Sequence, residues 1–187
     1  MVSAPLPSED VQQVVDTLIG VICEEMGLTL RRTRSEIAAS SSEPSEPAGD
    51  RWYYIQPVAA SQAEAPSSAP DSPPNLVLDH VNSTSGEDKL QQYLALGVPE
   101  IWRIDGQTLH FYQLEAGHYI ESDRSTAFPL VPIAEIPLFV GKSQKVGEQT
   151  VAKAFRAWSR MRIRENRGQS APPPPPPPPL PPLNPLL

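Results

Sequence analysis

The chain has 187 residues with 15 basic and 22 acidic side chains, a net charge of -7, 24 prolines and a single cysteine. One cysteine excludes an internal disulfide framework, and no stretch approaches the roughly 20 apolar residues of a membrane-spanning helix. The N-terminus also lacks the basic region that opens a secretory signal. We therefore expect a cytoplasmic protein whose fold is held by packing alone.

The prolines divide the chain into a folding part and a low-complexity part. Eleven of the 24 lie in the last seventeen residues, and residues 35–50 and 59–73 are rich in Ser, Ala, Glu and Pro. We expect one domain over residues 1–167, with exposed, mobile loops at 35–50 and 59–73. Residues 168–187 should form a disordered polyproline tail, either without a partner or as the ligand of an aromatic groove.

The first half of the domain predicts one helix and three strands. Apolar residues recur at three- and four-residue steps over 9–26, which is typical of an amphipathic helix ending at Gly27. Alternation predicts a strand over 28–34, and aromatic and β-branched residues predict strands over 51–58 and 75–81.

The second half predicts a helix, a hairpin and a long closing helix. The helical period returns over 85–96 and stops at Gly97. The pair Asp105-Gly106 favours a type I′ turn between strands 100–104 and 108–114, and a further strand follows over 118–122. Residues 147–167 carry Val151, Phe155 and Trp158 on one stripe and predict a helix. The fold class is α/β (α+β), with a central mixed sheet flanked by helices.

Several familiar sites are excluded by the sequence. There is no phosphate-binding glycine loop and no hydrolase elbow, and His80, His110 and His118 lack metal-ligand spacing. Cys23 lies among apolar residues of a predicted helix, where a thiol packs as a small inert hydrophobe.

Two acidic residues remain as candidates for chemistry. Asp50 begins the second predicted strand, and Asp79 lies inside the third, next to residues that favour burial. Two such carboxylates on adjacent strands would repel unless a cation lay between them, and hard oxygen ligands suit Mg²⁺ or Mn²⁺. Lys89 opens the following helix and could reach the same strand end. Spacing alone leaves the alternative open, in which the three are a turn residue, a sheet-edge residue and a solvated helix residue.

The string PNLVLDHVNSTSGEDKLQQYLALGVPEIW over 74–102, with RIDGQTLHFYQL after it, resembles the Uma-two family of endonucleases. The family's third strand reads PDLVLE, followed by a Ser/Thr-rich loop, a Lys, a Tyr and GVPEVW, and its EPD before an aromatic FYI matches AGDRWYYI. The resemblance spans about residues 9–160. It implies a restriction-endonuclease-like fold and a Mg²⁺-dependent nuclease site built from Asp50 and Asp79 as metal ligands. Lys89 is our candidate for a third catalytic residue beside them. We expect DNA as the partner, although the sequence does not distinguish DNA from RNA, and a homodimer is compatible with the sequence.

This sequence departs from the family at the site. Asp79 replaces a Glu and is one methylene shorter, and Val81 stands where the superfamily has its lysine, so that Lys89 would have to replace it. The alternative is therefore a catalytically degenerate member of the fold that serves as a binding or interaction module.

The charge is unevenly distributed along the chain. Residues 151–167 hold six basic side chains against one acidic one, and those at 153, 156, 160, 164 and 167 share one face of the predicted helix. We expect this face to be exposed, with Arg156, Arg160 and Arg164 as candidate nucleic-acid contacts. The alternative is a solvated face without a partner.

Overall fold

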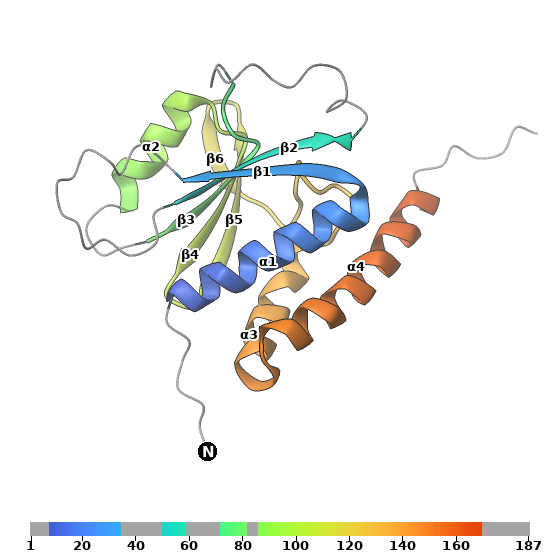
Figure 1. The fold of residues 1–187 in the computed structure, drawn as a ribbon. Coiled ribbons are helices and arrows are strands. Elements are labelled where there is room, and N and C mark those ends of the chain that lie inside the picture. The colour runs from blue at the N-terminus through green and yellow to red at the C-terminus, as the bar shows by residue number, and fades with distance from the viewer. Residues whose placement is uncertain (1–7, 35–49, 59–71, 82–85, 170–187) are drawn as a thin grey trace, which may run out of the picture.

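The computed structural model describes residues 8–34, 50–58, 72–81 and 86–169 of the chain (Figure 1). The low-complexity segments and the polyproline tail fall largely outside these ranges. No helix in the described ranges is long and apolar enough to cross a membrane.

Every element expected from the sequence is present, with ends that differ by at most two residues. The elements in chain order are α1 (Ser8–Met26), β1 (Leu28–Arg34), β2 (Arg51–Pro57), β3 (Leu76–His80), α2 (Gly86–Leu96), β4 (Glu100–Asp105), β5 (Thr108–Glu115), β6 (His118–Glu121), the 3-10 helix η3 (Ile133–Glu135), α3 (Ile136–Val146) and α4 (Glu148–Gln169). The sequence did not predict η3 and α3. Prolines interrupt this region, but Pro137 falls in the first turn of α3, where a proline costs no helical hydrogen bond.

The six strands form one sheet in the order of the chain. Neighbouring strands are antiparallel except β3 and β4, which are parallel and are joined through α2. The sheet is therefore mixed and flanked by helices, which confirms the expected α/β class.

One face of the sheet packs against α1, and α3 and α4 pack against α1 in the same layer (Figure 1). This layer contains the main hydrophobic core, in which α1 supplies Leu18 and Ile22 and β4 supplies Trp102. Phe155 of α4 is fully buried and packs edge-on against Phe139 of α3. The stripe predicted on α4 is confirmed at Val151 and Phe155, and Trp158 is partly buried against the same core.

The opposite face carries α2 and a much smaller apolar cluster. Its buried members are Val77, Tyr93, Val98 and Ile101. Residues alternate between the two faces along each strand, so Leu78 joins the main core while its neighbours Val77 and Asp79 face α2.

The hairpin between β4 and β5 is confirmed, but its turn is not the expected type I′. Asp105 pairs with Thr108, so the two central residues are Gly106 and Gln107, and only the glycine has a positive φ. Both central residues of the next hairpin, Ala116 and Gly117, have positive φ, which is the type I′ requirement.

Candidate active site at the end of the parallel strand pair

The register of the sheet places two acidic residues next to each other. Arg51 pairs with Leu78 across β2 and β3, so the next positions along both strands, Asp50 and Asp79, are cross-strand neighbours. Both are buried, and both face α2. The site lies at the carboxyl ends of β3 and β4, the edge of a parallel pair where binding sites commonly form.

Lys89, in the first turn of α2, bridges the two carboxylates. Its ammonium nitrogen lies 3.0 Å from Oδ1 of Asp50 and 3.5 Å from Oδ1 of Asp79. It also lies 3.5 Å from the backbone carbonyl oxygen of His80. Three oxygens from two strands therefore surround one cationic nitrogen, so the structure brings together all three residues proposed from the sequence. The shorter side chain of Asp79 still reaches the shared point.

The second oxygen of each carboxylate is held by a different donor. The hydroxyl of Tyr93 donates to Oδ2 of Asp50 at 2.6 Å, and Nε of Arg103 donates to Oδ2 of Asp79 at 2.6 Å. Tyr93 follows Lys89 by four residues, so both lie on the same face of α2. Arg103 is the register partner of Asp79 on β4.

Burial and charge act in opposite directions on this cluster. Burial, and then the negative charge of Asp50, raise the pKa of Asp79, whereas Arg103 and Lys89 lower it, and the net shift is upward. Burial and the neighbouring carboxylates also raise the pKa of Tyr93, so its phenol keeps the proton that it donates to Asp50. The cluster balances two carboxylates against two cationic side chains.

The donor set suits a hard divalent cation. Both Oδ1 atoms and the His80 carbonyl oxygen converge on one point, and oxygen donors of this kind are those that Mg²⁺ and Mn²⁺ prefer, with water completing the shell. Within the described residues no group of three or more His, Cys, Asp or Glu is arranged to hold a metal, so protein ligands would be the two aspartates and a carbonyl.

A third buried carboxylate, that of Glu100, has the contacts of a residue with a structural role. Glu100 is fully buried and accepts hydrogen bonds from Nε1 of Trp102, the backbone and hydroxyl of Thr126, and the amide of Ala127. These are neutral donors, and they anchor the segment after β6 to the start of β4. Asp50 and Asp79 differ because cationic groups meet them and because they face each other.

Sequence reasoning did not assign roles to Tyr93, Arg103 or the His80 carbonyl. The spacing of four between Lys89 and Tyr93 was a usable signal, because it places both on one side of a helix. Arg103 could not be found in this way, since only the β3–β4 register makes it a neighbour of Asp79.

The arginines of α4 lie on the other layer of the molecule. The helix α4 packs with α1 and α3 on the main-core face (Figure 1), whereas the carboxylates face α2 through their contacts with Lys89. Arg156 pairs with Glu24, and Arg160 makes two hydrogen bonds of 2.8 Å to Glu25. These bonds lower the pKa of Glu25. Arg164 is exposed on the same helix. The structure thus does not bring these arginines to the carboxylates.

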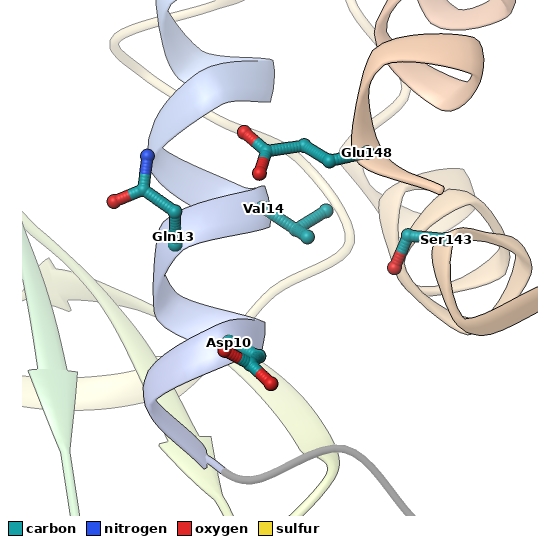
Figure 2. Close-up of a pocket in the computed structure, with 5 residues that line it drawn as sticks. All are labelled: Asp10, Gln13, Val14, Ser143 and Glu148. Carbon is teal, nitrogen blue, oxygen red and sulfur yellow. The ribbon is translucent and has the colours of Figure 1, made fainter.

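The remaining candidates lie away from the site or are inert. Burial raises the pKa of Cys23 to about 12, so this thiol stays protonated, as its predicted packing role requires. A pocket of about 160 Å³ opens between α1, α3 and α4 and is lined in part by Asp10 and Glu148 (Figure 2). Both acids lie in the first turn of a helix, where the helix dipole favours negative charge.

A mixed sheet with helices on both faces and facing carboxylates at the end of a parallel pair is the arrangement expected of the restriction-endonuclease-like class. The model of the Uma2 family, described as "Putative restriction endonuclease", matches residues 1–138. The chain belongs to this family, which agrees with the resemblance found in its sequence. No curated protein and no solved structure gives a further match.

Proposed function

We propose that this chain is a metal-dependent endonuclease that hydrolyses phosphodiester bonds of nucleic acid, with DNA as its substrate. The observation that carries the proposal is the convergence of Oδ1 of Asp50, Oδ1 of Asp79 and the His80 carbonyl oxygen on Lys89 Nζ, within 3.5 Å. Two like charges buried side by side repel each other, and a shared cation relieves that repulsion. Membership of the Uma2 family supports the same class of reaction.

Asp50 and Asp79 are the residues that would hold Mg²⁺ or Mn²⁺, with the His80 carbonyl beside them. When bound, the metal would supply an activated water and would neutralise phosphate charge. Lys89 is the group of this chain that would act on the substrate. It is 22% exposed, and its contacts of 3.0 and 3.5 Å are longer than the 2.6 Å contacts of Tyr93 and Arg103, so its ammonium can leave the carboxylates and contact a phosphate oxygen.

Nucleic acid has to approach the α2 side of the sheet to reach these residues. Arg156, Arg160 and Arg164 stay proposed contacts, but on the opposite layer they would hold a distant part of the substrate or a second molecule. A homodimer and a partner for the polyproline tail also stay proposals.

One observation favours a second candidate, a catalytically degenerate domain that binds without cleaving. Arg103 and Lys89 neutralise both carboxylates from within the chain, so the cluster is complete in charge without a metal. In that case the carboxylates, Lys89 and Arg103 would serve only to hold β2, β3, β4 and α2 together.

A plasmid-nicking assay with Mg²⁺ or Mn²⁺ separates the two candidates. We expect the wild-type chain to nick DNA only with the metal present, and Asp50→Ala and Asp79→Ala each to abolish nicking while the domain stays folded. Glu100→Gln is the matched control, since it alters a buried carboxylate on the other face of the sheet. A wild-type chain that binds DNA but never cleaves it, at any metal concentration, would support the degenerate domain.

A further inference from the structure

We infer that Tyr93 and Arg103 are positioning residues that aim the two aspartates at one cation, so that the metal site is formed before substrate arrives. The inference rests on the proposed function, because it concerns the metal that this function requires. It assigns a role to two side chains that the sequence-based site of Asp50, Asp79 and Lys89 does not include.

Tyr93 fixes the orientation of Asp50. Its hydroxyl is 2.6 Å from Oδ2, and the ring is 1% exposed within the apolar cluster under α2. A ring packed on all sides has one rotamer available, so the hydroxyl is a fixed donor. Because one carboxylate oxygen is held there, the other is directed toward the shared point.

Arg103 does the same for Asp79 from the opposite side. Its Nε is 2.6 Å from Oδ2, and its side chain is 11% exposed. Because Arg103 is paired with Asp79 across β3 and β4, the strand register fixes the point from which its side chain extends. The planar guanidinium group then limits the directions from which it can donate to the carboxylate. Oδ1 of Asp79 is thereby directed toward Oδ1 of Asp50.

The pattern of contacts separates two kinds of oxygen. Both Oδ2 atoms have short contacts of 2.6 Å from side chains of low exposure, whereas both Oδ1 atoms meet the longer contacts of the more exposed Lys89, and Oδ1 of Asp50 also accepts from the His80 amide at 3.4 Å. The Oδ1 atoms are thus the ones that can exchange an ammonium for a metal. Groups that orient metal ligands in this way typically contribute about 10- to 100-fold to metal affinity.

A matched pair of tyrosines makes the inference testable without catalysis. Tyr119 also packs against the cluster under α2, but its hydroxyl donates to the Val98 carbonyl at 2.8 Å and touches neither carboxylate. Tyr93→Phe and Tyr119→Phe each remove one hydroxyl and keep the ring. The experiment is a titration of the full chain with Mn²⁺ alone, followed by calorimetry, with urea unfolding measured on the same samples.

We expect Tyr93→Phe to raise the Kd for Mn²⁺ by about 10-fold or more, and Tyr119→Phe to leave it within about twofold of wild type. If the two hydroxyls contributed only to stability, both variants would unfold at lower urea concentration and neither would have a changed Mn²⁺ affinity. Arg103→Lys is the second variant, because it keeps the charge and removes the planar fork. It should also weaken Mn²⁺ binding.

The outcomes distinguish this inference from the function on which it rests. If the wild-type chain binds Mn²⁺ and both Tyr93→Phe and Arg103→Lys bind it equally well, the positioning roles are wrong and the metal site stands. If the wild-type chain binds no Mn²⁺, the metal-dependent function itself is overturned, and the inference with it.

Discussion

The two faces of the sheet have opposite compositions. The face toward α1, α3 and α4 is covered by a continuous apolar core, whereas the face toward α2 has a small cluster of four buried apolar residues beside a network of charges. Neighbouring residues of the same strand contribute to both, as Leu78 and Asp79 do on β3. The difference indicates that the main source of stability lies on one face and the candidate site on the other, one residue apart in the sequence.

This separation can be tested by changing one face and measuring the other. A change in the main core should lower the free energy of unfolding and leave metal binding intact. A change on the α2 face should alter metal binding or cleavage with little loss of stability.

The largest expected effect on stability is that of Phe155→Ala. Phe155 is fully buried between Phe139 and Trp158, so its removal leaves a cavity that should cost about 3–5 kcal/mol of unfolding free energy. Urea unfolding measures this loss. Without urea, where the variant is folded, its Mn²⁺ affinity should equal that of the wild type. A loss of Mn²⁺ affinity together with the loss of stability would show that the two faces are not independent.

Lys89→Met should change cleavage and metal binding in opposite directions. The ammonium and a metal ion compete for the same oxygens, so its removal should strengthen Mn²⁺ binding. If Lys89 contacts phosphate as proposed, cleavage should fall about 100-fold or more. Lys153→Met removes the same charge from the exposed surface of α4 and serves as the control. Weaker Mn²⁺ binding in Lys89→Met would contradict the proposed competition.

Asp79→Asn should make the protein more stable while abolishing cleavage. Burial and Asp50 raise the pKa of Asp79, which means that its ionised form is less favourable in the folded state than in the unfolded one. The neutral amide removes that cost and can still accept from Arg103. The gain should be present at neutral pH and should vanish in acid, where Asp79 is protonated in both states. Urea midpoints at several pH values measure it, and a lower midpoint at neutral pH would mark Asp79 as a structural anchor.

The smallest effect is expected from the arginines of α4. Changing Arg156, Arg160 and Arg164 together removes three candidate phosphate contacts. If all three arginines contact phosphate, the slope of log K for DNA binding against log salt concentration should become shallower by the amount expected for about three contacts. Arg156 and Arg160 already pair with Glu24 and Glu25, so we expect a reduction nearer to one contact. Fluorescence anisotropy of labelled DNA over a salt series gives the slope. A full three-contact reduction would make this layer the main nucleic-acid surface.

Local patterns were sufficient to predict most of the elements. The apolar periodicity of α1 and α4, and the aromatic and β-branched runs of β2 and β3, reflect which face of each element is buried, and this information is present in a short window of sequence. The same patterns failed at α3, where Pro137 in the first turn and Pro129 and Pro132 before it obscure the helical period, and at the β4–β5 turn. There the pairing of Asp105 with Thr108, which depends on the whole hairpin, decided the turn residues.

The sequence by itself determined the residue types of the candidate site. An aspartate within the apolar strand β3 is costly to bury, and this cost is enough to single out Asp79 from the sequence. The tertiary structure alone decided how Asp50, Asp79, Lys89, Tyr93 and Arg103 meet, because they come from three strands and a helix. Strand register and the packing of α2 place their atoms within hydrogen-bonding distance, and neither can be deduced from spacing along the chain.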